Sequence, residues 1–384
     1  MSSFLISAGD ASGEMHAAGL VRALRRRAPQ SRFAGLGGSE MQRAGVELLA
    51  PQRDLAVGGL FEVLGSLRRI RSAWRRMNRA LEARPDLLVL VDSPDFNIPL
   101  ARRARRLGLP VLYYIGPQVW AWRRGRVRKI ARRVDRLAVI FPFEVDFYRG
   151  AGLPVEFVGH PLVERLADFA RDWPRARARA ALQLAPERPL LALLPGSRRN
   201  ELQRMLPLQL EVARILHARL PSLHFAVALA QSIPREAAAP LLARAGADLP
   251  LSVHEGRTWQ VLRAADAALA KPGTITMELA LLGTPFAVAL RVHPLSALIG
   301  RRLIEVPSFT MPNLIAGAPI APEFMQEQAQ PARIAEALRE LLSGPARQRQ
   351  CEALDSVRRT LGAGGSAGRV AEIALEMVRG ASGA

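Results

Sequence analysis

Residues 190–201, which read Leu-Leu-Ala-Leu-Leu-Pro-Gly-Ser-Arg-Arg-Asn-Glu, decide the fold class. Five consecutive apolar residues cut off by Pro-Gly predict a strand buried on both faces, as strands inside parallel sheets are. Apolar residues at helical spacing follow at once, at Leu202, Leu206, Leu208 and Val212. A buried strand, a short loop and a helix are the repeating elements of an α/β domain.

The loop between this strand and this helix carries groups that suit a phosphate. Gly196 lets the backbone approach a ligand, and Ser197 supplies a hydroxyl donor. Arg198 and Arg199 supply cations, and free N–H groups at a helix start together with a guanidinium form a good phosphate site. A tight β–α turn with two solvated arginines explains the same residues equally well, because most such turns bind nothing.

The composition is that of a soluble globular protein. The chain has 384 residues, 49% apolar and 23% charged, which is enough for two domains. The single cysteine, Cys351, excludes a disulfide framework and a cysteine-based metal site. Residues 1–10 lack the pattern of a signal peptide, and prolines interrupt the longest uncharged run, 306–322. We therefore expect a cytosolic protein without a membrane span.

The net charge of +20 comes almost wholly from arginine, with Lys129 and Lys271 as the lysines. Such a surplus attracts phosphates, whether on nucleic acid, on anionic lipid or on a phosphorylated substrate. Runs of arginine are most often solvated helix faces. Charge alone does not choose among these interpretations.

The N-terminus predicts the first β–α turn of a doubly wound sheet. Residues 4–8 read as a short strand, and the loop Gly-Asp-Ala-Ser-Gly-Glu at 9–14 opens a helix. Ligands lie beyond the strand ends in such sheets, so we expect Ser12 and Gly13 of this loop to lie beside a ligand site. The loop lacks the dinucleotide-binding glycine pattern, which disfavours a redox cofactor. We interpret His16 as a helix residue near the site, since histidine is often simply structural.

An amphipathic pattern covers residues 55–81, where apolar side chains at helical spacing alternate with arginines. A helix with an apolar stripe and an arginine flank suits an anionic lipid surface. An ordinary helix packed on the sheet is the alternative, and we favour it for Trp74, Met77 and Leu81. The segment assigned to lipid contact carries Val57, Leu60, Val63, Leu64 and Leu67.

A carboxylate follows the next buried strand, 87–91, in the sequence Asp-Ser-Pro-Asp-Phe-Asn. Such a group points toward the ligand and acts as a general base if a hydroxyl lies within reach. Capping of a helix that begins near Ile98 is the alternative role, and Asp95 fits it better. Asp92 is therefore the candidate base. Trp120, beside arginines, suits either a sugar or lipid contact or core packing.

The second half repeats the phosphate-binding pattern. After a polar segment, 167–189, that we interpret as a linker, a strand at 267–270 leads into Lys-Pro-Gly-Thr and a helix. Gly273 and Thr274 thus form a second anion site, and Glu278, one turn further, suits a ribose diol. No Asp-x-Asp motif is present, so we expect arginine and helix N-termini to neutralise a diphosphate, without metal or cofactor.

Several short motifs, weak singly, recur in an order and spacing that are specific together. They span nearly the whole chain and comprise 8–14, 92–97, 117–122, 159–161, 194–198 with Glu201, 273–274 with Glu278, 312–317, and 322–323 with Gln326. The sequence resembles the lipid-A-disaccharide synthases, glycosyltransferases of the GT-B fold. It departs from that pattern where the acids of the first loop are exchanged, as Asp10 and Glu14, and where Pro272 replaces the usual serine.

The resemblance implies an α/β chain with two Rossmann-like, doubly wound domains that face a central cleft. Residues 1–175 would bind the acceptor and lipid, and residues 176–345 the UDP-sugar. Residues 346–384 would form C-terminal helices that pack back toward an N-terminal domain. Whether the protein forms a homodimer stays open.

The implied reaction transfers 2,3-diacylglucosamine from UDP-2,3-diacylglucosamine to 2,3-diacylglucosamine 1-phosphate (lipid X), with inversion, giving a β(1→6) disaccharide 1-phosphate and UDP. Asp92 would deprotonate the acceptor 6-hydroxyl. The residues implied for the UDP-sugar are Gly196, Ser197, Arg198, Gly273, Thr274, Glu278, Asn313 and Gln326. Those assigned to acceptor and lipid are Ser12, Gly13, Val57, Leu60, Val63, Leu64, Leu67 and Trp120.

Two other classes of protein compete with this interpretation. Another UDP-sugar enzyme of the same fold, such as a UDP-GlcNAc transferase or epimerase, would keep the nucleotide sites but needs no lipid patch. An arginine-rich nucleic-acid binder would explain the charge but not the paired glycine loops. We therefore expect the two lipid substrates and an anionic inner-membrane surface as partners, no nucleic acid, and a peripheral location on the cytoplasmic face of that membrane.

Overall fold

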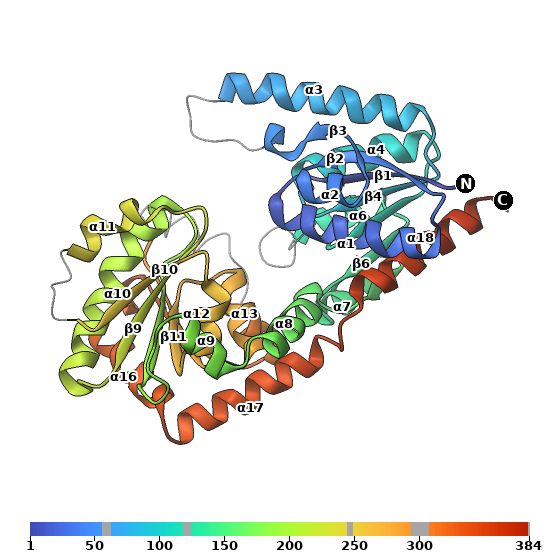
Figure 1. Cartoon of the computed structure of the whole chain (residues 1–384). Coiled ribbons are helices and arrows are strands. Elements are labelled where there is room, and N and C mark those ends of the chain that lie inside the picture. The colour runs from blue at the N-terminus through green and yellow to red at the C-terminus, as the bar shows by residue number, and fades with distance from the viewer. Residues whose placement is uncertain (56–62, 118–123, 244–248, 293–306, 383–384) are drawn as a thin grey trace. The chain divides into compact units, whose positions relative to one another are not determined.

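The computed structural model describes residues 1–55, 63–117, 124–243, 249–292 and 307–382. The chain divides into two compact units, Met1–Pro161 with Ala363–Ala384, and Leu162–Gly362. Each unit is an α/β structure with its own parallel sheet (Figure 1). The division lies ahead of the boundary expected at residue 175, and the final helix belongs to the first unit.

Seven parallel strands form the sheet of the first unit, in the order β3-β2-β1-β4-β5-β6-β7. The strands are β1 (Ser3–Ala8), β2 (Arg32–Gly37), β3 (Glu47–Pro51), β4 (Leu87–Val91), β5 (Val111–Tyr114), β6 (Arg136–Val139) and β7 (Val155–Phe157). The described helices are α1 (Ala11–Arg27), α2 (Ser39–Arg43), η1 (Gln52–Leu55), α3 (Val63–Glu82), α4 (Pro94–Arg106), η3 (Arg124–Arg126), α6 (Val127–Ala131), α7 (Phe143–Arg149) and α18 (Ser366–Ser382). The strand order reverses between β1 and β4, so the loops after these two strands are neighbours. Ligands bind at such a point in doubly wound sheets.

Six parallel strands form the sheet of the second unit, in the order β10-β9-β8-β11-β12-β13. The strands are β8 (Leu190–Leu194), β9 (His224–Leu229), β10 (Leu251–Glu255), β11 (Ala267–Ala270), β12 (Phe286–Leu290) and β13 (Glu323–Met325). The described helices are α8 (Pro161–Asp172, which begins at the unit boundary), α9 (Arg175–Ala181), α10 (Arg199–Arg219), α11 (Arg235–Ala243), α12 (Thr258–Ala264), α13 (Thr274–Leu282), α15 (Met311–Ala316), η4 (Gln326–Gln328), α16 (Pro331–Leu342) and α17 (Pro345–Thr360). Here the order reverses between β8 and β11, which brings the two glycine loops together.

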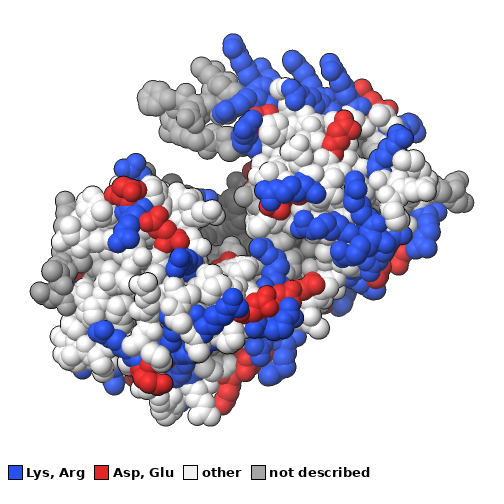
Figure 2. Space-filling model, viewed as in Figure 1, with Lys and Arg blue, Asp and Glu red and all other residues white. Residues whose placement is uncertain are grey.

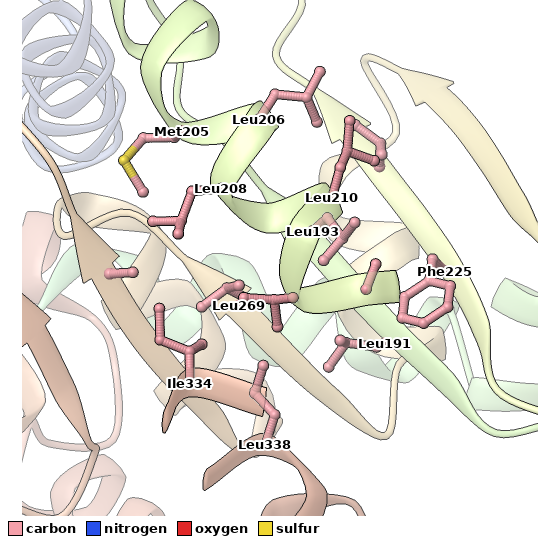
Figure 3. Close-up of a cluster of buried hydrophobic side chains, with 14 of the residues drawn as sticks. Leu191, Leu193, Met205, Leu206, Leu208, Leu210, Phe225, Leu269, Ile334 and Leu338 are labelled. Atoms are coloured by element: carbon pink, nitrogen blue, oxygen red, sulfur yellow. The ribbon is translucent and has the colours of Figure 1, made fainter. Parts of the chain in front are cut away.

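Strand β8 lies in the middle of this sheet, and all of its residues are buried. On one face, Leu191 and Leu193 pack among apolar side chains of α10 and α16 (Figure 3). The other face carries Leu190, Ala192 and Leu194, which are also buried. A strand covered on both faces has to be apolar throughout, which is the physical reason for the uninterrupted run in the sequence.

Helix α18 completes the first unit by packing on α1. Arg27 pairs with Glu372 at 3.0 Å, and Arg136 pairs with Glu376 at 2.9 Å. These exposed pairs contribute little free energy, so the buried apolar face of α18, which includes Val370 and Ala374, stabilises the contact.

The prediction that residues 167–189 form a linker is wrong, because much of this segment is helical and belongs to the second unit. It contains the end of α8 and the whole of α9. Arg179 of α9 is only 3% exposed, pairs with Asp266 at 2.9 Å, and donates to backbone carbonyls. The accepting carbonyls are those of Ala264, Ala185, Pro186 and Arg188. One arginine of this polar segment, Arg179, is thus the centre of a buried turn.

Candidate active site

Asp10 joins the two loops at the reversal point of the first sheet. As the N-cap of α1, it accepts a hydrogen bond from the Gly13 amide at 2.7 Å through one carboxylate oxygen. Its other oxygen accepts from the Ser93 hydroxyl at 3.0 Å. The loop after β1 is therefore tied to the loop after β4, in which Asp92 lies.

Glu14, the other acid of the first loop, has a structural role. Its buried carboxylate accepts from the Glu40 amide and from the Gln52 side chain, each at 2.6 Å. Both of its oxygens are thus used, and one of them caps the start of α2.

The backbone at Asp92 is held by buried side chains. Asn97 donates to the carbonyls of Val91 and Asp92, at 3.1 and 2.7 Å. The Tyr113 hydroxyl donates to the same Asp92 carbonyl at 2.7 Å. Asp92 and Ser93 both have φ of 46°, in the left-handed region that non-glycine residues rarely adopt. Such strain is found mainly at functional sites.

The Asp92 carboxylate is poised to accept a proton near neutral pH. Burial raises its pKa to about 6, and the negative charge of Asp10 adds to this effect. A hydrogen bond from the Ser93 amide acts in the opposite direction. A carboxylate with a pKa close to the working pH suits general-base catalysis.

Asp95 does not cap α4, contrary to the expectation. The helix begins at Pro94, so Asp95 lies inside its first turn, and its N-cap is Ser93. The Asp95 side chain is 81% exposed and pairs with Arg126 at 2.8 Å. Exposure and a paired cation make it a poorer base than Asp92.

The residues assigned to acceptor and lipid are only partly described. Ser12 is exposed and lies 3.4 Å from the Nε2 atom of His16, whose ring meets Tyr114 edge-on. Gly13 is buried and its amide is used by Asp10. Leu67, on α3, is 43% exposed. Val57, Leu60 and Trp120, and the side chains of Val63 and Leu64, lie outside the described residues.

The expectation that the C-terminal half of α3 packs against the rest of the unit is confirmed. Met77 and Leu81 are fully buried, and the Trp74 ring meets Phe96 edge-on at 5.6 Å.

A cavity of about 850 Å³ lies at the reversal point of the second sheet. The loops after β8 and β11 form its floor, and α8 and α12 contribute side chains to its wall. Of the residues predicted for the UDP-sugar, it brings together Gly196, Ser197, Arg198, Gly273, Thr274 and Glu278. Its volume is within the usual range for a small-molecule site.

The first phosphate loop is fixed by Glu201, from the first turn of α10. The carboxylate accepts from the Ser197 amide at 3.0 Å and pairs with Lys271 of the other loop at 3.0 Å. Gly196 has φ of +119°, and a Cβ atom there would lie 2.8 Å from Glu201 Cβ. Glycine is therefore required for two reasons, conformation and space.

The wall beside Glu278 is aromatic and basic. The Trp259 indole donates a hydrogen bond to the Glu278 carboxylate. The Trp259 ring also lies 5.3 Å from the Arg165 guanidinium and 5.3 Å from the Phe169 ring, both of α8. Burial raises the pKa of Glu278, while Trp259 and Arg165 lower it. The carboxylate is thus oriented and accessible from the cavity.

Asn313 and Gln326 do not line this cavity in the described residues. The Asn313 amide donates to the Ala321 carbonyl and to Glu323, and accepts from the Ala321 amide, at 2.8–2.9 Å. Gln326 accepts from the Val292 amide at 3.2 Å. The hydrogen bonds of both side chains thus hold the local backbone.

Nearly the whole length of the chain matches one family model. A family model described as lipid-A-disaccharide synthetase matches residues 4–377. The chain belongs to the lipid-A-disaccharide synthase family. The synthase of Geobacter sulfurreducens is 45% identical over 377 residues, covering 97% of each chain. That of Nitrosococcus oceani is 44% identical, covering 98% of this chain and 96% of its own. The resemblance predicted from the motifs is confirmed.

Solved structures confirm the GT-B fold of this synthase-family chain. A UDP-GlcNAc 2-epimerase from Neisseria meningitidis superposes with a TM-score of 0.67 at 12% identity, covering 98% of this chain and all of its own. The glycotransferase of kitacinnamycin superposes at 0.63 with 19% identity, covering 98% of both chains. At these identities the likeness concerns the fold. Family and fold together make the chain a glycosyltransferase, as predicted.

Sequence reasoning missed the aromatic wall of this synthase-family site. Arg165 and Trp259 are far apart in the chain and meet only in the fold. Glu201 and Lys271 belong to the two predicted loops, but their ion pair follows only from the pairing of β8 with β11 in the sheet.

None of the helices within the described residues is both long and apolar enough to span a membrane.

Proposed function

We propose that the protein transfers 2,3-diacylglucosamine from UDP-2,3-diacylglucosamine to the 6-hydroxyl of 2,3-diacylglucosamine 1-phosphate. The products are the β(1→6) disaccharide 1-phosphate and UDP. The observation that carries this proposal is the cavity of the second unit, where both phosphate loops, Arg198 and Glu278 line one space. Membership of the synthase family supplies the substrate class.

The donor binds in this cavity. Arg198 and the amides at the start of α13 hold the diphosphate, and the Ser197 hydroxyl adds a donor. Glu278, oriented by Trp259, accepts hydrogen bonds from the ribose hydroxyls. Asn313 and Gln326 act on the donor indirectly, by holding the backbone beside them.

Asp92 takes the proton of the acceptor 6-hydroxyl as its oxygen attacks the anomeric carbon. The bond from that carbon to the UDP oxygen breaks, with inversion, and negative charge grows on the leaving diphosphate. Arg198 and the α13 N-terminus stabilise that charge. The residues proposed for the donor belong to the second unit, and Asp92 belongs to the first.

Release of UDP tests the reaction, with both diacylated substrates present and with each omitted in turn. Asp92→Asn should lower turnover by about 10²–10⁴-fold and leave UDP binding unchanged. Asp95→Asn is the matched control from the same loop and should turn over near the wild-type rate. Wild-type turnover in Asp92→Asn would exclude it as the base.

The first unit docks on the anionic cytoplasmic face of the inner membrane. Basic side chains project along α3, at the upper edge of Figure 2, and Arg68, Arg71 and Arg75 are among the exposed ones. Each basic residue close to an anionic bilayer contributes about 1 kcal/mol. Leu67, exposed on the same helix, belongs to the segment predicted to contact lipid.

Flotation with anionic liposomes tests the docking surface. Arg71→Gln with Arg75→Gln should weaken binding about tenfold or more. Arg333→Gln with Arg349→Gln, exposed arginines of α16 and α17, changes the net charge equally and should bind like the wild type. Equal losses in both pairs would mean that net charge, not α3, governs binding.

A further inference from the structure

A second cavity, of about 450 Å³, lies at the β10 edge of the second sheet. Its polar lining consists mainly of the imidazoles of His224 and His254, the Ser252 hydroxyl, and the guanidinium-bearing side chains of Arg235 and Arg257. Leucine and valine side chains form much of the remainder. The volume lies within the range of small-molecule sites.

The polar groups of this cavity are arranged in one row. The Ser252 hydroxyl lies 3.0 Å from His224 Nε2 and 2.9 Å from His254 Nε2. Because a hydroxyl has one proton, it donates to one ring and accepts from the other. Within the described residues, the buried Nδ1 atom of His224 has no hydrogen-bond partner. The Ser252 hydroxyl thus joins the two rings in one hydrogen-bonded row.

Positive charge surrounds the row without a balancing carboxylate. No Asp or Glu lines the cavity, and Arg235 and Arg257 form no ion pair within the part of the chain that the structure describes. Burial lowers the pKa of His224 to about 4, assisted by Arg188 and His254. Burial lowers the pKa of His254 too, assisted by Arg257 and Arg235. Both rings are thus neutral at pH 7 and lie beside the two cations.

An anion is the ligand that this chemistry favours. Two imidazoles and a hydroxyl are also metal ligands, but a cation would be repelled by the flanking guanidiniums and would find no carboxylate. A dianion would pair with both guanidiniums, of which that of Arg257 also donates to the Ala181 carbonyl at 3.0 Å, and would favour protonation of both rings. We propose that the cavity bounded by His224, Ser252, His254, Arg235 and Arg257 binds a small phosphate monoester, with its organic part against the apolar wall.

The segment from His254 to Trp259 borders both cavities of the second unit. His254 and Arg257 face the smaller one, whereas Gly256, Thr258 and Trp259 line the larger one. A phosphate probe can therefore enter either cavity, and the experiment has to locate it by substitution.

Calorimetric titration of the full-length protein with glycerol 3-phosphate and with inorganic phosphate provides the test. Arg235→Gln with Arg257→Gln removes both exposed cations of the cavity and should weaken binding of glycerol 3-phosphate about tenfold or more. Arg333→Gln with Arg349→Gln makes the same charge change elsewhere in the unit and should leave the affinity unchanged. Equal affinities in the two double variants, or no binding by the wild type, would overturn the proposal.

Titration with sulfate separates the contribution of the rings, since sulfate keeps two negative charges between pH 5.5 and 7.5. Sulfate should bind the wild type more tightly at pH 5.5, because both imidazoles take up protons on binding. His224→Gln with His254→Gln should remove this pH dependence. If that variant fails to fold, proton uptake measured in two buffers of different ionisation enthalpy tests the same point on the wild type, and an uptake of zero would contradict it.

Discussion

Asp92→Asn should stabilise the first unit, by an amount that grows with pH. The pKa of Asp92 is raised from 3.8 to about 6 in the fold. The folded state therefore disfavours ionisation. Below the unfolded pKa both states are protonated and the carboxyl costs nothing. The cost appears as pH rises above 3.8 and is complete above about 6, because the unfolded chain ionises first.

The magnitude follows from the size of the shift. One pKa unit corresponds to about 1.4 kcal/mol, so a shift of roughly two units costs about 3 kcal/mol at pH 7.5. At pH 4.5 only about 1 kcal/mol of this cost has appeared. Asparagine carries no charge at either pH. Its stabilising effect relative to aspartate should therefore grow by about 2 kcal/mol between pH 4.5 and 7.5.

Urea unfolding at the two pH values measures this difference, followed for the transition of the first unit. Asp95→Asn is the control, because its carboxylate is 81% exposed and its free energy of unfolding should change little with pH relative to the wild type. The reasoning would be refuted if Asp92→Asn shifted the unfolding free energy equally at pH 4.5 and pH 7.5.

Three further substitutions test the site. Gly196→Ala should cost about 1–3 kcal/mol of stability and weaken UDP binding, because φ is +119° there; calorimetry measures both. Trp259→Phe keeps the ring but removes the donor to Glu278, so the dissociation constant for UDP should rise roughly fivefold to tenfold at pH 7. Asp10→Asn removes a negative charge beside Asp92, and the acid limb of the kcat/KM profile should move to lower pH by on the order of half to one unit; an unmoved limb would exclude this coupling.

The sheets were predictable because their strands are buried on both faces. Residues 190–194 and 87–91 carry no polar side chain, so their sequence admits few other structures. The glycine loops after residues 190–194 and 267–270 then located the six predicted residues that line the cavity. That step needs only the chain order and the rule that loops at a reversal point are neighbours.

The linker prediction was wrong because arginine serves two physical roles, at the surface and in buried hydrogen-bonded turns. The arginines of 167–189 resemble a solvated linker in composition, yet Arg179 is buried and satisfied by carbonyls and Asp266. The Asn313 amide forms hydrogen bonds with Ala321 and Glu323, and its role toward the donor stays a prediction. Neither outcome follows from local sequence, because the partners become neighbours only in the fold.

The fold stabilises the backbone of Asp92 but not the charge of its carboxylate. Asn97 and Tyr113 both donate hydrogen bonds to the Asp92 carbonyl. The Ser7 hydroxyl orients the Asn97 side chain by donating to its amide oxygen at 2.6 Å. These hydrogen bonds offset the cost of the left-handed backbone, which is on the order of 1–3 kcal/mol. These hydrogen bonds reach only the main chain. Burial and the negative charge of Asp10 raise the pKa of the carboxylate, and the hydrogen bond from the Ser93 amide offsets part of that effect. The backbone of Asp92 is therefore fixed while its carboxylate is poorly solvated. The raised pKa suits this carboxylate to accept a proton, and it lowers the free energy of unfolding above pH 3.8.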